Sequence, residues 1–202
     1  MRNAIALLIL CLTISAARAQ GPSYPYSGNL SWTPSSTSGC TGQNVYRAPY
    51  TTACGTFAVL PAGSNIGPAL TSFADSTVAN GGSYCYGVTA IGGNGKESAL
   101  DIASSNPTLI PPAPPTNATV TVAKNANGTE DAIYAWDNPP GELTGNSIFC
   151  GAKKPSAVIV KVFFPTTKVR VTSPAGTNEC AITATGKTGE SGLSNVVKVA
   201  VP

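Results

Sequence analysis

Two copies of one sequence pattern constrain the fold of this chain more than any other feature. The first copy is Gly81–Ser98, GGSYCYGVTAIGGNGKES, and the second is Gly176–Ser191, GTNECAITATGKTGES. In both copies apolar side chains recur at every second position, which places them on one face of a β-strand. These positions hold Tyr84, Tyr86, Val88 and Ala90 in the first copy, and Cys180, Ile182 and Ala184 in the second. A Gly-rich turn and a Glu-Ser pair follow each strand, so the pattern predicts two similar strand-rich units.

The pattern resembles the fibronectin type III family. Strand F of that family reads roughly Y-x-Y-x-V-x-A after a glycine, followed by a Gly-rich turn and E-S-x-x-S-N. Gln43–Ala48, QNVYRA, is similar to strand C of bacterial fibronectin type III repeats. The resemblance covers nearly all of 29–202 and is to tandem repeats of a secreted bacterial protein. It implies an all-β fold of two immunoglobulin-like (fibronectin type III) β-sandwiches in tandem.

The resemblance also implies a role for one tyrosine. Tyr84 stands where the family places its corner tyrosine, whose ring packs on the core and whose hydroxyl bonds back to the backbone. Asn178 stands at that position in the second copy, so the second copy has lost the corner tyrosine. Trp32 and Trp136 alternate with Leu30 and Tyr134 in the two B strands, and we expect both indoles to point inward.

The chain divides into a leader, two domains and a linker. Residues 1–19 have the charge, apolar run and Ala17-Arg18-Ala19 site of a secretory signal peptide, and the apolar run is too short to span a membrane. We expect domain 1 at 20–106 and domain 2 at 117–202. Between them, residues 107–116 hold five prolines, which predicts a semi-rigid, extended linker.

The first domain has little sequence from which to build a strand A. Only Gln20–Gly28 precedes strand B, and that segment contains Pro22 and Pro25, which disfavour a paired strand. We therefore expect strand A of domain 1 to be short or absent. Three explanations stay open: crude coverage by the short segment, a longer natural amino terminus, or a strand supplied by another chain.

Composition argues against catalysis and against nucleic acid as a partner. The chain has no histidine, and without its leader it carries 10 basic and 9 acidic residues, since Arg2 and Arg18 are removed from 12. A near-neutral chain has no basic stripe for phosphates. Without histidine, the Ser-His-Asp and Cys-His arrangements cannot be built. The clustered acids Glu130, Asp131, Asp137 and Glu142 fall in predicted turns. We expect no enzyme, no metal site and no cofactor.

Five cysteines remain after removal of the leader, and an exported protein can oxidise them. In the fold that the resemblance implies, strands C and F are neighbours, and Cys150 and Cys180 both face inward near the same end. We therefore predict a buried Cys150–Cys180 disulfide. For the first domain we predict Cys54–Cys85, pointing off the core face, while a Cys40–Cys54 pairing stays open. Cys40 is then the leftover thiol, which is able to join two chains.

One apolar run is a candidate interaction surface. Val158–Phe164, VIVKVFF, is rich in β-branched and aromatic residues and is interrupted only by Lys161. We expect it at or beside an edge of the second sandwich, where such strands invite pairing. Its candidate contact residues are Val158, Val160, Val162 and Phe164. The run is covered either by its own loop or by a partner, and self-association is one form of the latter.

These features predict a secreted, non-catalytic binding or adhesion module, or a spacer, at the cell surface or in the extracellular matrix. The partner is then an extracellular protein or polysaccharide of unknown identity, and the location is extracellular or periplasmic. The alternative is a structural subunit of an extracellular polymer assembled by strand donation. Fold alone does not choose between them.

Overall fold

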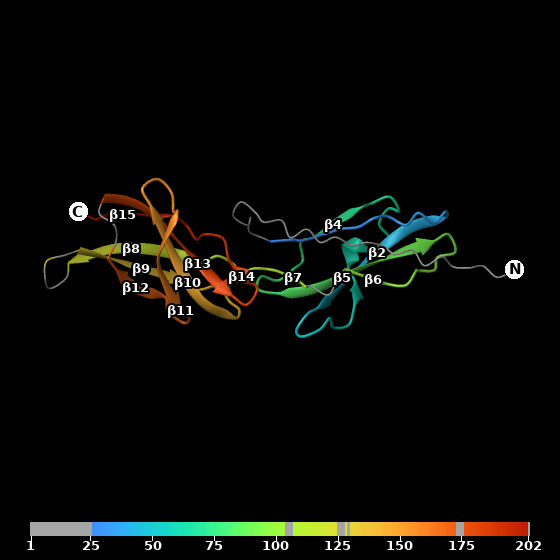
Figure 1. The fold of residues 1–202 in the computed structure, drawn as a ribbon, viewed down its shortest axis with the longest axis horizontal. Coiled ribbons are helices and arrows are strands. Elements are labelled where there is room, and N and C mark those ends of the chain that lie inside the picture. Colours follow the sequence, from blue (N-terminus) through green and yellow to red (C-terminus); the bar gives the residue numbers. More distant parts are fainter. Residues whose placement is uncertain (1–25, 104–106, 125–127, 129, 173–175, 202) are drawn as a thin grey trace. The chain divides into compact units, whose positions relative to one another are not determined.

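The computed structural model describes residues 26–103, 107–124, 128, 130–172 and 176–201, which form two compact units (Figure 1). Unit 1 is built from the described residues of 27–78 and 83–109. Unit 2 is built from those of 110–202 with the segment 79–82 and Tyr26. Each unit is a β-sandwich, as the sequence predicted. No helix in these ranges is long and apolar enough to cross a membrane. The predicted signal peptide lies outside the described residues.

Unit 1 packs two antiparallel sheets against each other. In one sheet, β1 (Gly28–Ser31) pairs with β4 (Ser72–Asp75). The other sheet has the order β3 (Ala58–Val59), β2 (Cys40–Pro49), β5 (Ser83–Gly92), β6 (Asp101–Ile102), and β7 (Thr108–Leu109) also pairs with β5. A 3₁₀ turn, η1 (Pro61–Gly63), follows β3. Both sheets contribute to the core, which contains Leu30, Trp32, Val45, Leu60, Tyr86 and Val88.

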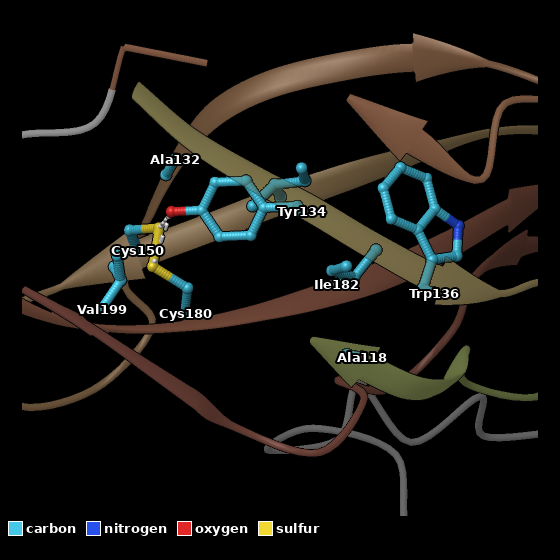
Figure 2. Packing of buried hydrophobic residues seen from close by; sticks show 9 residues of the cluster. Ala118, Ala132, Tyr134, Trp136, Cys150, Cys180, Ile182 and Val199 are labelled. Carbon is cyan, nitrogen blue, oxygen red and sulfur yellow. Dashed lines mark hydrogen bonds between the residues drawn. A yellow bond between two sulfur atoms is a disulfide. The ribbon is translucent and has the colours of Figure 1, made fainter. Parts of the chain in front are cut away.

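Unit 2 repeats this plan. One sheet has the order β12 (Lys168–Val171), β9 (Glu130–Asp137), β8 (Thr116–Lys124). The other has the order β11 (Ala157–Phe163), β10 (Leu143–Gly151), β13 (Gly176–Gly186), β14 (Gly189–Glu190), and β15 (Val197–Val201) also pairs with β13. Several of these strands, β9, β11 and β15 among them, are longer than their counterparts in unit 1. Figure 2 shows the Tyr134 ring beside the disulfide, with Ile182 and Trp136 farther along the core.

The Glu-Ser pair of the repeated pattern does the same work in both units. The Ser98 hydroxyl accepts the N–H of Ala90 at 3.0 Å, and the Ser191 hydroxyl accepts the N–H of Ala184 at 2.8 Å. The glutamate before each serine accepts a hydrogen bond from a threonine hydroxyl of the strand. Thr89 donates to Glu97 in unit 1, and Thr183 donates to Glu190 in unit 2. The pair therefore ties the segment after the Gly-rich turn to the strand before it, which explains why the pattern recurs.

Several predicted boundaries shift. The strand expected at Leu70–Phe73 is β4, two residues later, and the strand expected at Thr56–Leu60 is reduced to β3. Thr108–Leu109, inside the segment expected as linker, form β7 and pair with β5. Within the described residues β1 pairs only with β4, whereas β9 of unit 2 lies between two strands. Strand A of domain 1 was expected to be short or absent within Gln20–Gly28, and residues 20–25 of that segment lie outside the described residues.

Candidate functional site

The most polar buried group of unit 1 belongs to the core and not to a binding site. The Asp75 carboxylate accepts hydrogen bonds from Arg47 at 2.7 Å, from the Tyr86 hydroxyl at 2.9 Å, and from both the N–H and the hydroxyl of Thr77. Burial opposes ionisation of Asp75, but these hydrogen bonds outweigh burial and lower its pKa. Every partner is internal, so the network closes the sandwich and offers nothing to a ligand.

Glu97 is the centre of a second polar cluster, on the outer face of the larger sheet of unit 1. Its carboxylate accepts hydrogen bonds from the Thr89 hydroxyl at 2.6 Å, the Tyr46 hydroxyl at 2.7 Å and the Asn44 amide at 2.7 Å. These hydrogen bonds lower the pKa of Glu97. Its oxygens are therefore already engaged. In the part of the chain that the structure describes, no three His, Cys, Asp or Glu side chains gather closely enough to hold a metal ion.

The feature of unit 2 that fits a binding site is the side of the sandwich formed by β11 and β12. β11 ends the order of one sheet and β12 ends the order of the other. Only Phe164–Thr167 connect them, too short a segment to cross the sandwich to its opposite side. Figure 1 draws both strands along the lower side of unit 2. We call residues 152–171 the β11–β12 flank.

Two phenylalanines project from the turn of this flank. Phe163 is 86% exposed and Phe164 is 48% exposed, and Phe163 is the most exposed large apolar side chain described. Gly145 lies opposite Phe163, and a Cβ there would collide with the carbonyl oxygen of Val162. Glycine therefore lets β10 approach β11 closely beside these rings. We call Phe163 and Phe164 the aromatic tip.

The aromatic tip is fixed to the body of unit 2 by hydrogen bonds on both sides. The Phe164 N–H donates to the carbonyl of Thr144 at 3.1 Å, and the Thr166 N–H donates to the carbonyl of Phe163 at 3.0 Å. Thr166 and Thr167 are held by Asn138, which follows β9, and by β9 itself. Asn138 donates to the Thr166 carbonyl at 3.3 Å, and the Trp136 N–H donates to that of Thr167 at 3.1 Å. The rings are therefore presented on an ordered backbone.

The Asn138 contact has a counterpart in unit 1 that explains its origin. There the Trp32 indole donates to Gln43, and the Gln43 amide donates to the carbonyls of Gly67, Pro68 and Leu70. The equivalent residue of unit 2 is the shorter Asn146. It donates to Asn138 at 2.9 Å, and Asn138 accepts the Trp136 indole at 3.0 Å. Two asparagines thus replace one glutamine in joining the tryptophan to the next loop.

The flank also carries a cluster of basic residues. Between Leu143 and Asn178 there are five basic residues and no acidic one. Lys153, Lys154, Lys161 and Lys168 are exposed and make no ion pair within the residues that the structure describes. The other three lysines of unit 2 each lie within 4.0 Å of a glutamate: Lys124 near Glu130, Lys187 near Glu142, and Lys198 near Glu179. The uncompensated cations are therefore concentrated on one side.

The structure divides the four predicted contact residues into two pairs. Val158 (42% exposed) and Phe164 are exposed, whereas Val160 and Val162 are half-buried and pack against the core. The pairing of β10 with β11 shifts between Ile148 and Phe149, and this bulge turns Val158 to the face opposite Val160. The sequence reasoning omitted Phe163, although an aromatic residue next to a proline-containing turn is a signal that could have identified it.

The cysteines lie as the sequence predicted. Cys54–Cys85 is formed with Cα atoms 5.7 Å apart, on the outer face of its sheet, and Cys150–Cys180 joins directly paired residues of β10 and β13 in the core of unit 2. Cys40 is free and half-exposed. Tyr84 packs at the edge of the unit 1 core with Arg47 4.9 Å above its ring. Its hydroxyl bond to the backbone stays a prediction.

Several solved structures resemble the fold of these two units. A two-domain fibronectin type III segment of chicken tenascin matches with a TM-score of 0.50 and 13% identity, over 87% of this chain and 92% of that one. Both units have the fibronectin type III fold. The FN1–FN3 domains of chicken CNTN1 match at 0.40 and 16% identity over 90% of this chain, which spans 63% of their length. The chicken interferon gamma receptor alpha chain matches at 0.42 and 14%, over 86% of this chain and 91% of that one.

These likenesses are in structure and not in sequence. No family model matches the sequence, and no curated protein matches it either. At such identities the comparisons establish the fibronectin type III fold of the two units and leave the function to the site itself.

Proposed function

We propose that this protein is a secreted, non-catalytic binding module that acts at the cell surface or in the extracellular matrix. Its partner is an extracellular protein or polysaccharide, which it contacts through the β11–β12 flank of unit 2. The observation that carries the proposal is the aromatic tip, where an 86% exposed Phe163 stands on a backbone fixed by hydrogen bonds. An exposed ring on a backbone that is already fixed contributes contact area at a lower entropic cost than one on a mobile loop.

The disulfides support the proposed compartment. Two intramolecular disulfides in a chain of this size are typical of proteins that fold in an oxidising environment. Residues 1–19, with the pattern of a secretory leader, support the same location.

The experiment is an array of extracellular proteins and polysaccharides probed with three forms of the full mature chain. These are the unaltered protein, the double variant Phe163→Ser with Phe164→Ser, and the control Leu193→Ser with Val196→Ser. Leu193 (44% exposed) and Val196 (49%) are also exposed apolar residues of unit 2 but lie away from the flank. We expect one or more ligands whose binding falls by about tenfold or more in the tip variant only.

Two outcomes contradict the proposal. The first is an array without any ligand for the unaltered protein. The second is a ligand that both variants bind as well as the unaltered protein does, because such a ligand contacts a surface other than the aromatic tip.

A further inference from the structure

We propose that the β11–β12 flank recognises an acidic, extended polypeptide segment of another protein, which adds to the edge of β11 as a further strand. This inference rests on the proposed function and names the chemistry of the partner. Three features support it: the edge position of β11, the uncompensated lysines of the flank, and the aromatic tip at the end of the strand.

The edge position supplies the backbone. β11 runs for seven residues, pairs with β10 along one side, and pairs with nothing else among the described residues. Alternate residues of an edge strand direct their N–H and C=O groups away from the sheet, where an extended segment can bond to them. β12, the edge of the other sheet, has four residues and offers a shorter template. β11 is therefore the strand on which a partner segment adds.

Charge selects the chemistry of the segment. Lys161 is the only charged residue of β11, and it is exposed on the same face as Phe163. Lys153 and Lys154 stand before the strand and Lys168 after the tip, each without an ion pair in the described residues. A strand added beside β11 places a side chain directly opposite Lys161, where opposite charge is favourable and like charge is not. An acidic segment fits this edge and a basic one is repelled.

The same charges argue against a second copy of this chain as the occupant. Antiparallel pairing of two β11 strands brings the lysines of both flanks together. The chain's nine acidic residues are dispersed, and the only adjacent pair is Glu130-Asp131, where Glu130 already lies near Lys124. The complementary acidic strand therefore comes from a different molecule.

The spacing of β11 predicts the pattern of that strand. Lys161 and Phe163 are two residues apart and share a face, so their neighbours on the added strand are also two apart. An acidic residue opposite Lys161 and an apolar residue opposite Phe163 give the pattern acidic-x-apolar in either order. This is strand addition with specificity from alternate side chains.

The experiment uses the full mature chain and short, end-capped peptides. The acidic peptide alternates Val and Glu on one strand face, with Thr on the other. Its comparisons are the same sequence with Lys in place of Glu, and the acidic peptide with alternate backbone amides methylated to remove the strand hydrogen bonds. Heparin is the polyanion that cannot form a strand. Titration calorimetry gives the affinities, and amide hydrogen exchange reports on β11.

We expect the acidic peptide to bind about tenfold or more tightly than the Lys peptide and than the methylated one. We also expect it to slow exchange of amides in β11. Lys161→Glu should reverse the preference between the acidic and the Lys peptide. Lys96→Glu, the same charge change at an exposed lysine of unit 1, should leave it unchanged.

Three results overturn the inference. Equal binding of the methylated peptide shows attraction without strand addition, and binding of heparin but not of the acidic peptide assigns the flank to a polyanionic polysaccharide. An unaltered preference in Lys161→Glu removes the flank from the interaction. If an array ligand still depends on Phe163 while the acidic peptide fails to bind, the proposed function stands and this inference alone is rejected.

Discussion

The two units bury a tyrosine hydroxyl in equivalent sandwiches but give it different partners. In unit 1 the fully buried Tyr86 of β5 donates to the Asp75 carboxylate, which Arg47 also contacts. In unit 2 the fully buried Tyr134 of β9 lies 3.4 Å and 3.3 Å from the two sulfurs of the Cys150–Cys180 disulfide (Figure 2). The same fold is completed by a buried charge in one unit and by a covalent bond in the other.

The position of the second disulfide completes the contrast. Unit 1 also has a disulfide, Cys54–Cys85, but it lies on the outer face because Cys85 alternates with the inward Tyr84 and Tyr86. One step along the strand therefore decides whether a cysteine pair fills the core or clips the surface. In unit 1, where the disulfide lies on the outer face, the buried Tyr86 hydroxyl donates to the Asp75 carboxylate and not to a sulfur.

The largest expected difference concerns the disulfides. They close loops of nearly equal length, with separations of 31 and 30 residues, so loop closure contributes about 3.5 kcal/mol in either unit. Cys150→Ala with Cys180→Ala also leaves a core void, which adds about 1–2 kcal/mol. Urea unfolding, with hydrogen exchange of β13 and β5 to assign each transition, should show a larger loss in unit 2 than Cys54→Ala with Cys85→Ala causes in unit 1. Equal losses would show that packing around the inner bridge adds nothing.

Asp75→Asn should destabilise unit 1 by about 3 kcal/mol, because it removes the charge that Arg47 and Tyr86 meet inside the sandwich. The folded pKa of Asp75 lies below its ordinary value. Its stabilisation is therefore full above the unfolded pKa of about 3.9 and is lost as the pH falls through the folded value. Calorimetry between neutral and acidic pH should show unit 1 losing stability on acidification, and Asp75→Asn should flatten that loss. An unchanged acid profile in Asp75→Asn contradicts this assignment.

Gln43 and Asn146, the side-chain amides near the two tryptophans, should contribute unequally to stability. The difference between them is expected to be smaller than the two effects above. Gln43→Leu leaves the Trp32 indole and three carbonyls without their side-chain partner, at a cost of about 2–3 kcal/mol. Asn146→Leu should cost only about 1 kcal/mol, because the Asn146 amide oxygen has no partner within the part of the chain that the structure describes, and Asn138 still accepts the Trp136 indole. Thermal unfolding of the two variants measures the difference. A larger loss in Asn146→Leu would show that the two networks are not equivalent.

The smallest effect is a gain in stability. A buried carboxylate oxygen of Asp101 in β6 has no hydrogen-bond partner among the described residues, and burial raises the pKa of this group. Asp101→Asn removes the charge while keeping the shape, and we expect unit 1 to gain about 1 kcal/mol at neutral pH. The gain should shrink as the pH falls and Asp101 itself becomes protonated. A loss of stability at neutral pH would show that the charge is compensated.

The strands and their inward faces could be predicted from local alternation, and the cysteine pairs from that alternation together with the strand order that the family resemblance implies. Period-two patterning around Tyr86 and Ile182 identifies the strands and their inward faces. Once the faces are known, the directions of Cys85 and Cys180 follow from their parity. The recurring Glu-Ser pair was visible as a pattern, although its bonds to Ala90 and Ala184 were not.

The candidate site was predicted only in part. The sequence indicated an apolar edge strand, and period two grouped Val158 with Val160 and Val162. The bulge opposite Ile148 and Phe149 breaks that grouping, and a bulge depends on how two strands register and not on the sequence of one of them. Phe163 was not among the predicted contact residues because the even-numbered residues were taken as the exposed face, whereas Val160 and Val162 face the core and Lys161 and Phe163 face outward.

The sequence by itself therefore predicted the two units and most of their strands, because these follow from the spacing of residues along one segment. The cysteine pairs also needed the strand neighbours that the family resemblance implies. The tertiary structure alone decided which groups meet across segments. It brought Asp75 to Tyr86, placed the Tyr134 hydroxyl beside the disulfide, and left the four lysines of the flank without an acidic partner among the described residues. Such meetings depend on sheet order, register and loop path, which arise only when distant segments pack together and exclude water.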